Sequence, residues 1–162
     1  MSVARQVLLV GGFALATLGM IYGLHYALFV EHQTLDRMGG SLAQAFMQAA
    51  ERRTAEVNDS VDQYAATKYA YVRQVDVHSH WIGLAMLLIV FGVAFDSLSF
   101  PEQVRTWIAA ALVTGSFLFP LGVILQTVSG NTVYASALAI FGSATVTIAL
   151  AAVVWGYWRV RA

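Results

Sequence analysis

The sequence predicts an all-α protein: a bundle of four transmembrane helices with an extracytoplasmic helical hairpin between spans one and two. Two observations predict this fold. Long runs of the 162-residue chain carry no charge, and 59% of its residues are hydrophobic while only 11% are charged. About a quarter of the residues in a soluble domain are charged. The composition therefore excludes a disordered chain and most soluble enzymes, and with zero net charge it also excludes a basic nucleic-acid-binding protein.

Four segments are apolar enough to cross a bilayer, which takes about 20 residues in a helix. Residues 6–30 and 77–95 contain no Asp, Glu, Lys or Arg, and a third uncharged run lies between Arg105 and Arg159, with Gly130-Asn131 near its middle. We therefore predict one integral membrane domain over residues 1–162, with spans at about 6–30, 77–97, 104–128 and 132–158. The lipid bilayer is then the first partner of the chain.

The arginines of the short segments predict the orientation. Arg5, Arg105, Arg159 and Arg161 all fall on one side of the predicted bundle. Lys and Arg in short loops favour the cytoplasmic side. We therefore expect both termini in the cytoplasm, residues 31–76 outside, and a location in a bacterial inner membrane.

The long segment between spans one and two is predicted to form two helices over about 34–76. Residues at helical spacing are Leu35, Met38, Leu42, Ala45, Phe46 and Ala49 in its first half, and Val57, Val61, Tyr64, Lys68, Tyr71 and Val75 in its second. Asn58-Asp59-Ser60 is a turn signal, and Ser60 with Gln63 fits a capping box. We expect the second helix to continue into span two. The hairpin is interpreted as a cap on the bundle end, or as a docking platform or lid over a site.

Small residues form stripes on the first and fourth spans. They are Gly12, Ala16, Gly19 and Gly23 in the first, and Ala135, Ala139, Gly142, Ala149, Ala152 and Gly156 in the fourth. Small residues allow helix backbones to approach closely in lipid. We expect these stripes to pack within the bundle, with contacts to a homo-oligomer or to other membrane subunits as the alternative.

All four histidines gather at the predicted outer end of spans one and two: His25, His32, His78 and His80. Ionisable groups at membrane depth are costly and tend to mark function. Imidazole binds haem iron, copper and zinc. Facing histidines on neighbouring helices suit a haem b held in a bundle. The alternative is that they are interfacial side chains that bond water and lipid headgroups.

Helix geometry limits the possible ligand pairs. Positions i and i+2 of a helix point about 200° apart. His78 and His80 therefore bind one metal together only if the helix begins after them, which would suit copper. We predict His25 and His80 as the first pair of cofactor ligands, with His78 as the alternate. His32 completes the predicted metal-binding set as a peripheral ligand.

The stretch Val77-His78-Ser79-His80-Trp81, followed by Gly83 and Gly92, resembles one helix of the catalytic subunit of haem-copper oxidases and nitric oxide reductases. It also resembles small membrane proteins with the same His-x-His helix start. The oxidase resemblance implies that His78 ligates an active-site haem and His80 an electron-transfer haem, from opposite faces. This chain lacks the His-His pair of the copper site and has four predicted spans where that subunit has about twelve. Oxygen or nitric oxide reduction by this chain alone is therefore not expected.

The predicted function is binding of a redox cofactor, haem b before copper, for electron transfer or within a respiratory-type complex. The alternative is a non-catalytic structural or assembly subunit of a larger membrane complex. Asp96, at the end of span two, is interpreted as an interfacial cap, or alternatively as the start of a proton path.

Overall fold

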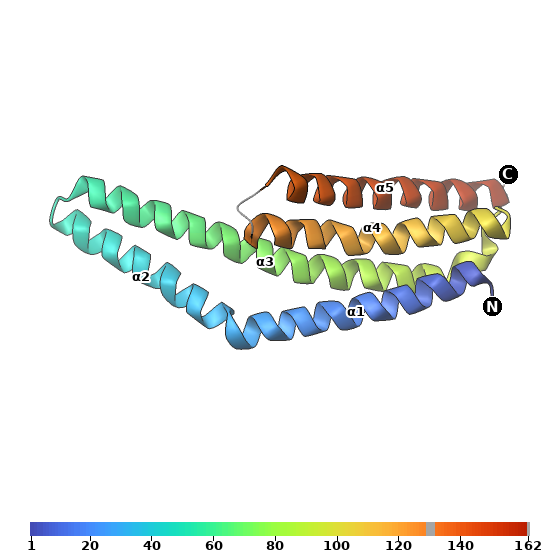
Figure 1. Cartoon of the computed structure of the whole chain (residues 1–162), viewed down its shortest axis with the longest axis horizontal. Helices are drawn as coiled ribbons and strands as arrows, with labels where there is room; N and C mark the ends of the chain where they lie inside the picture. The colour runs from blue at the N-terminus through green and yellow to red at the C-terminus, as the bar shows by residue number, and fades with distance from the viewer. Residues whose placement is uncertain (129–131, 162) are drawn as a thin grey trace. The chain divides into compact units, whose positions relative to one another are not determined.

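The computed structural model of the chain describes residues 1–128 and 132–161. Its helices are α1 (Val3–Phe29), α2 (Glu31–Ala50), α3 (Thr54–Ala94), the short 3-10 helix η1 (Phe95–Ser97), α4 (Glu102–Val128) and α5 (Val133–Arg161) (Figure 1). Helices α1, α3, α4 and α5 are long and apolar enough to cross a membrane. The predicted all-α fold with four candidate spans is therefore confirmed, and α2 lies between the first two. The loop predicted at 129–131 lies outside the described residues.

Span two is the C-terminal half of a much longer helix. Helix α3 runs for 41 residues, from Thr54 to Ala94, without a break at the predicted start of the span, residue 77. The expected continuation of the second hairpin helix into this span is confirmed. The other three candidate spans begin and end within about three residues of their predicted bounds.

The chain forms two compact units, and α1 and α3 contribute to both. Unit 1 consists of residues 1–20 and 77–162, and unit 2 consists of residues 21–76. Unit 1 contains most of the four candidate spans, and unit 2 contains the hairpin of α2 and the first part of α3. The prediction of one integral membrane domain stays a prediction.

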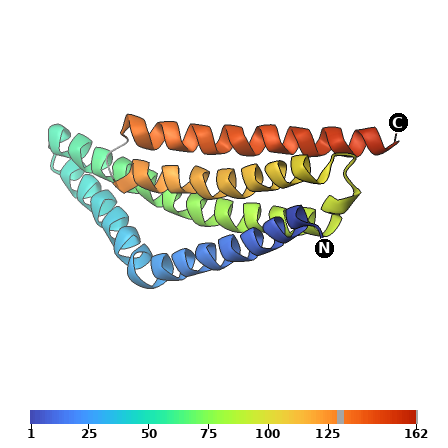
Figure 2. The ribbon, with the colours of Figure 1, turned by 45° about the vertical axis from the view of Figure 1, so that its right-hand side comes forward.

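Unit 1 is a bundle whose helices approach closely at glycines. Helix α4 lies between α3 and α5 (Figures 1 and 2). A Cβ atom added to Gly142 of α5 would lie 2.5 Å from the backbone nitrogen of Phe119 in α4, and one added to Gly12 of α1 would lie 3.1 Å from the carbonyl oxygen of Ala85 in α3. The small-residue stripes therefore pack within this unit at these positions, as expected.

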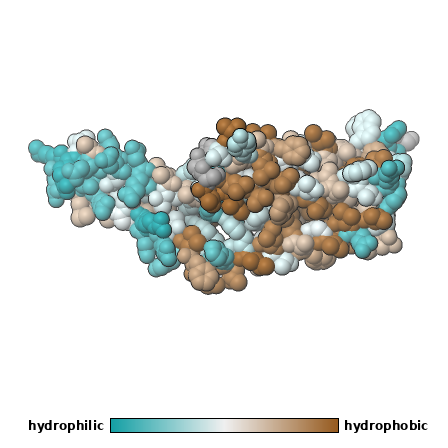
Figure 3. Space-filling view, viewed as in Figure 1, coloured by the Kyte–Doolittle hydropathy of each residue, from teal (hydrophilic) through white to brown (hydrophobic). Residues whose placement is uncertain are grey.

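The face of unit 1 seen in Figure 3 is apolar over much of the candidate spans, as its brown area shows. Large exposed side chains on this unit include Phe13, Val90, Val93, Ile140, Phe141 and Ile148. A water-soluble protein rarely exposes so continuous an apolar surface. Four candidate spans with such a surface fit an integral membrane protein.

The turn of the hairpin in unit 2 lies earlier than predicted. Helix α2 ends at Ala50 and α3 begins at Thr54, with Arg52 in the left-handed region at φ 57°. The predicted turn and capping box at 58–63 are wrong, because these residues lie inside α3. Instead, the Ser60 hydroxyl donates a hydrogen bond to Oε1 of Gln48, 2.8 Å away on α2. The exposed surface of a charged helix can thus have the same polar composition as a turn, and this is why the turn was predicted too late in the chain.

Small and polar residues, and not the largest apolar ones, form the hairpin interior. Thr34, Ser41 and Ala45 of α2 are buried, whereas 45% of Leu35 and 74% of Phe46 are exposed. The helical periodicity was predicted correctly, but the larger apolar side chains lie on the outside of the hairpin. The larger side chains Met38, Tyr64 and Tyr71 are half-buried, so burial follows the face of each helix and not size alone.

Candidate functional site

The four histidines lie on three helices and in both units. His78 and His80 lie on the part of α3 that belongs to unit 1. His25 on α1 and His32 on α2 belong to unit 2. The two pairs therefore have their surroundings in different units.

His78 is held by the backbone of α1. Its Nδ1 lies 2.9 Å from the carbonyl oxygen of Gly19. Because a carbonyl oxygen only accepts, Nδ1 is the donor in this bond, and the bond occupies only one of the two ring nitrogens. Histidines that bind metals show this same arrangement, with one ring nitrogen donating to a carbonyl and the other facing the metal. The contact depends on Gly19, since a Cβ atom there would lie 3.1 Å from the Cβ of Trp81.

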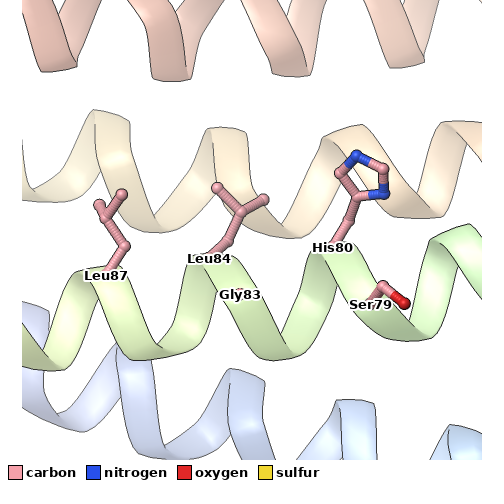
Figure 4. A pocket seen from close by; sticks show the side chains of 5 residues that line it. All are labelled: Ser79, His80, Gly83, Leu84 and Leu87. Carbon is pink, nitrogen blue, oxygen red and sulfur yellow. The ribbon is translucent and has the colours of Figure 1, made fainter.

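His80 faces the other neighbouring helix. Its ring stands edge-on to Phe119 of α4, with 4.9 Å between the ring centroids and 85° between the planes. Figure 4 shows the His80, Leu84 and Leu87 side chains all extending from α3 toward α4. These three residues, with Ser79 and Gly83, line a groove of about 280 Å³. An imidazole therefore lies beside an open, mainly apolar groove.

Gly83 keeps part of this groove open. A Cβ atom added to Gly83 would meet no other atom within 4 Å. Most other glycines of unit 1 are closely covered by a neighbouring helix, for example Gly92 by Leu9. A flat ligand could lie against the backbone at Gly83 while a nitrogen of His80 approaches it from the side.

The continuity of α3 separates the directions of His78 and His80. The helix is unbroken from Thr54 to Ala94, so these two positions diverge by about 200° around its axis. His78 contacts α1 and His80 contacts α4. The condition for chelation of one copper ion by both, a helix that begins after them, is not met.

The two histidines of unit 2 have local partners. The His25 ring packs on Phe29 one turn further along α1, with 5.5 Å between the centroids. Nε2 of His32 lies 3.4 Å from Oδ2 of Asp36, and 87% of the His32 side chain is exposed. The predicted pairing of His25 with His80 joins residues of different units and stays a prediction.

Within residues 1–128 and 132–161, no group of three or more His, Asp or Glu side chains could hold a metal ion. A six-coordinate haem needs only two protein ligands, so it does not require such a group. The features of unit 1 that bear on haem binding are the contacts of its two histidines and the groove beside His80.

A second polar cluster lies at the opposite end of unit 1, where α1 and α4 begin and η1 ends α3. Oδ2 of Asp96 lies 3.8 Å from Arg5 Nη1, and Oδ1 lies 3.7 Å from Arg105 Nη1. The Ser2 hydroxyl also donates to Asp96. Arg105 further bonds Glu102, at 2.8 Å, and the backbone oxygen of Asp96, at 2.9 Å. These contacts agree with the interpretation of Asp96 as a cap.

That these charges form one network was not predicted from the sequence. The available signal was that each residue lies at the end of an uncharged run: Arg5 before the first, Asp96 after the second, and Arg105 before the third. Antiparallel spans bring such ends together in pairs. Only the tertiary structure shows that the start of α1 lies beside the connection between α3 and α4.

Comparison of the chain with family models, with curated proteins and with solved structures gives no match.

Proposed function

We propose that this integral membrane protein binds a redox cofactor, haem b before copper, through His80 at the start of its second span. The observation that carries the proposal is the His80 imidazole beside the groove over Gly83. Electron transfer, alone or as a small subunit of a respiratory-type complex, follows as the role. The protein belongs in a bacterial inner membrane with both termini in the cytoplasm.

The donor set and the groove fit a haem on chemical grounds. Ligand sites are mostly apolar concavities with a few polar groups that fix the orientation of the ligand. Leu84 and Leu87 supply apolar surface, and Gly83 leaves room for the edge or face of a planar ring. His80 would supply a nitrogen ligand beside this groove, and a second ligand would have to come from outside it.

His25 would be the second residue to hold the haem. His78 serves as the alternate, at a separate site, because it contacts α1 while His80 contacts α4. This division of roles follows the resemblance of the His78-Ser79-His80 start to an oxidase helix that carries ligands on opposite faces. The Nδ1 bond to Gly19 supports a ligand role for Nε2 of His78. His32 stays a peripheral metal ligand in this proposal.

The test uses the purified full chain in detergent, as isolated and after titration with haemin. We expect a Soret band that is abolished in His80→Ala and weakened in Gly83→Leu, which fills the groove but keeps the imidazole. Gln33→Ala is the matched control, since Gln33 is exposed on α2, and it should keep the band. A shift from a six- to a five-coordinate spectrum in His25→Ala would support the second ligand.

Two results would reject the haem proposal. One is the absence of a Soret band after reconstitution of folded wild-type protein. The other is a band of equal intensity in wild type, His80→Ala and Gly83→Leu. Copper bound stoichiometrically to haem-free wild type and lost in His80→Ala would favour copper as the cofactor.

The second candidate is a non-catalytic structural or assembly subunit. One observation favours it: the hairpin of unit 2 exposes large apolar side chains such as Phe46, Met47 and Tyr69. A subunit that works through its surface should keep stable partners when all four histidines are replaced by alanine. Loss of those partners in the fourfold variant would count against this candidate.

A further inference from the structure

The contact between α4 and α5 opens into a second groove near the start of α4. The two helices lie side by side in unit 1 (Figures 1 and 2). Trp107 and Ala111 of α4 line one wall of the groove, and Thr145, Ile148 and Ala152 of α5 line the other. The volume of the groove is about 310 Å³, and it shares no lining residue with the groove beside His80. It is therefore a feature separate from the proposed cofactor site.

The walls of this groove suit a hydrocarbon chain better than a polar ligand. The Thr145 hydroxyl already donates a hydrogen bond to the carbonyl oxygen of Phe141, 2.8 Å away. The other lining residues are apolar, apart from the indole of Trp107. A polar molecule would give up its hydrogen bonds to water here without replacing them, and that is costly. An acyl chain has no such bonds to lose.

The groove lies at the depth of a single lipid leaflet. Helix α4 begins at Glu102, so Trp107 and Ala111 lie about 8 and 14 Å along its axis. One leaflet contributes about 15 Å to the hydrocarbon core of a bilayer. Trp107, Trp155 and Trp158 are all exposed at this end of unit 1, as is typical of the membrane interface. A chain that enters beside these rings would run along the groove toward the middle of the bilayer.

Arg159 lies in line with the groove at its interfacial end. It follows Ala152 by seven residues, so it lies on nearly the same side of α5, about 10 Å further along the helix. Its side chain is exposed. A positive charge thus stands at the level of the lipid headgroups, directly beyond an apolar groove.

The acidic side chains at this end of unit 1 are paired with other arginines. Asp96 contacts Arg5 and Arg105, and Glu102 contacts Arg105. Within residues 1–128 and 132–161, no carboxylate lies within ion-pair distance of Arg159. A guanidinium group binds a phosphate strongly, because two of its N–H groups can donate in parallel to two oxygens.

We propose that this surface binds one anionic phospholipid, with an acyl chain in the groove between α4 and α5 and the phosphate on Arg159. The apolar groove and the charge follow one another in the same order as the chain and the phosphate of such a lipid. Basic sites between transmembrane helices recognise anionic headgroups in this way. An anionic lipid is favoured over a zwitterionic one because Arg159 has no neighbouring carboxylate that would pair with the amine of the latter.

The charge pattern argues against a second copy of this chain as the occupant of the groove. The sequence carries no charge between Arg105 and Arg159. A symmetric pair of copies joined at this groove would bring the two Arg159 side chains together, with no acidic residue of the spans to compensate them. Like charges at an interface oppose association. A phosphate compensates the same charge.

The first experiment tests the charge. The full chain is taken into mild detergent from vesicles of equal parts phosphatidylglycerol and phosphatidylcholine, and native mass spectrometry counts the lipids that remain bound. Wild type should retain one phospholipid per chain, mainly phosphatidylglycerol. Arg159→Gln should lower the preference for phosphatidylglycerol by about fivefold, and Arg159→Lys should lower it less. Arg37→Gln is the matched control, an exposed arginine of α2 in unit 2, and it should leave the preference unchanged.

The second experiment tests the groove. Ala152→Phe fills the groove and should abolish retention of the lipid. Ala151→Phe is the matched control, because Ala151 is exposed on the same helix but does not line the groove. In nanodiscs, phosphatidylglycerol with brominated acyl chains should quench the tryptophan fluorescence of wild type more than brominated phosphatidylcholine does. Ala152→Phe should remove this difference and Ala151→Phe should keep it. Circular dichroism establishes that both variants keep wild-type helicity.

Three results would overturn the proposal. One is a wild type that retains no lipid and is quenched equally by the two brominated lipids. Another is equal behaviour of Arg159→Gln and Arg37→Gln, or of Ala152→Phe and Ala151→Phe. The third is binding of inorganic phosphate that is lost in Arg159→Gln while Ala152→Phe still retains lipid as wild type does. Arg159 would then bind a free anion, and the groove would not hold a lipid chain.

Discussion

Nδ1 of His78 on α3 lies 2.9 Å from the carbonyl oxygen of Gly19 on α1. This bond orients the imidazole, and it requires that the two helices approach closely at a residue without a side chain. The space available at Gly19 therefore limits both the packing of α1 on α3 and the position of a candidate ligand.

Gly19→Leu should destabilise the protein by about 1–3 kcal/mol, the usual cost of overpacking a close contact. A Cβ atom at Gly19 would already lie 3.0 Å from Cδ1 of Ile82. Unfolding in mixed detergent micelles measures the effect. Gly83→Ala is the control, because its Cβ would meet nothing within 4 Å. Equal stability of the two variants would show that α1 and α3 are not in close contact at Gly19.

Alanine at the glycines between α4 and α5 should be far more costly than alanine at the glycines of α2. A Cβ atom at Gly122 would collide with the backbone of Ala139, and one at Gly142 with the backbone of Phe119. We expect each substitution to destabilise the protein by at least about 2 kcal/mol, since backbone atoms cannot move aside as side chains do.

The matched variants Gly39→Ala and Gly40→Ala should instead stabilise the hairpin by about 0.5–1 kcal/mol each. Added Cβ atoms at these two positions meet nothing within 4 Å, and alanine is the better helix former. The same Gly→Ala substitution is thus predicted to destabilise the protein at Gly122 and Gly142 and to stabilise it at Gly39 and Gly40. Thermal unfolding followed by circular dichroism would contradict it if all four substitutions shifted the midpoint in the same direction.

Asp96→Asn should destabilise unit 1 by about 1 kcal/mol or less, because the carboxylate is 42% exposed and water screens its pairs with Arg5 and Arg105. Arg105→Gln should cost more. The Arg105 side chain is only 17% exposed and also bonds Glu102 and the Asp96 carbonyl. Denaturant unfolding of both variants at low and at high salt measures how much of each loss of stability is electrostatic. The Asp96→Asn effect should shrink as salt rises, and an effect that is independent of salt would contradict an electrostatic origin.

Arg52→Gly should stabilise the hairpin by about 1 kcal/mol. Arg52 has a φ of 57°, a conformation that costs an ordinary L-residue about 1–2 kcal/mol and costs glycine little. Arg53→Gly is the control, since Arg53 has a negative φ and its guanidinium pairs with Glu51 and Glu56. Hydrogen exchange of the amides next to the turn should slow in Arg52→Gly, and faster exchange there would refute the assigned turn.

The positions of the spans could be predicted because the rule that sets them is local. Hydrocarbon excludes charge from about 20 consecutive residues, and the uncharged runs of the sequence mark those segments directly. The turn of the hairpin could not be predicted in the same way. Asn58, Asp59 and Ser60 suit a turn, but they also suit the surface of a charged helix, and the partner of Ser60 is Gln48 on the other helix.

The predicted cofactor ligands stay a prediction, but part of the geometry around them followed from the sequence. The spacing of His78 and His80 was enough to show that they point in different directions along one helix. Their partners, Gly19 and Phe119, lie 59 and 39 residues away in the chain, and no local pattern identifies them. The opening at Gly83 likewise depends on which neighbouring helices leave that glycine uncovered.

The sequence by itself determined that the chain is helical, which segments suit a membrane, and that the histidines lie near the end of the first apolar run or just after it, and at the start of the second. Only the tertiary structure decided which side of each helix faces its neighbour. That choice placed Thr34, Ser41 and Ala45 inside the hairpin and left Leu35 and Phe46 outside. The reason is physical: periodicity defines the faces of a helix, but the face that becomes buried is selected by how closely the partner helix can approach.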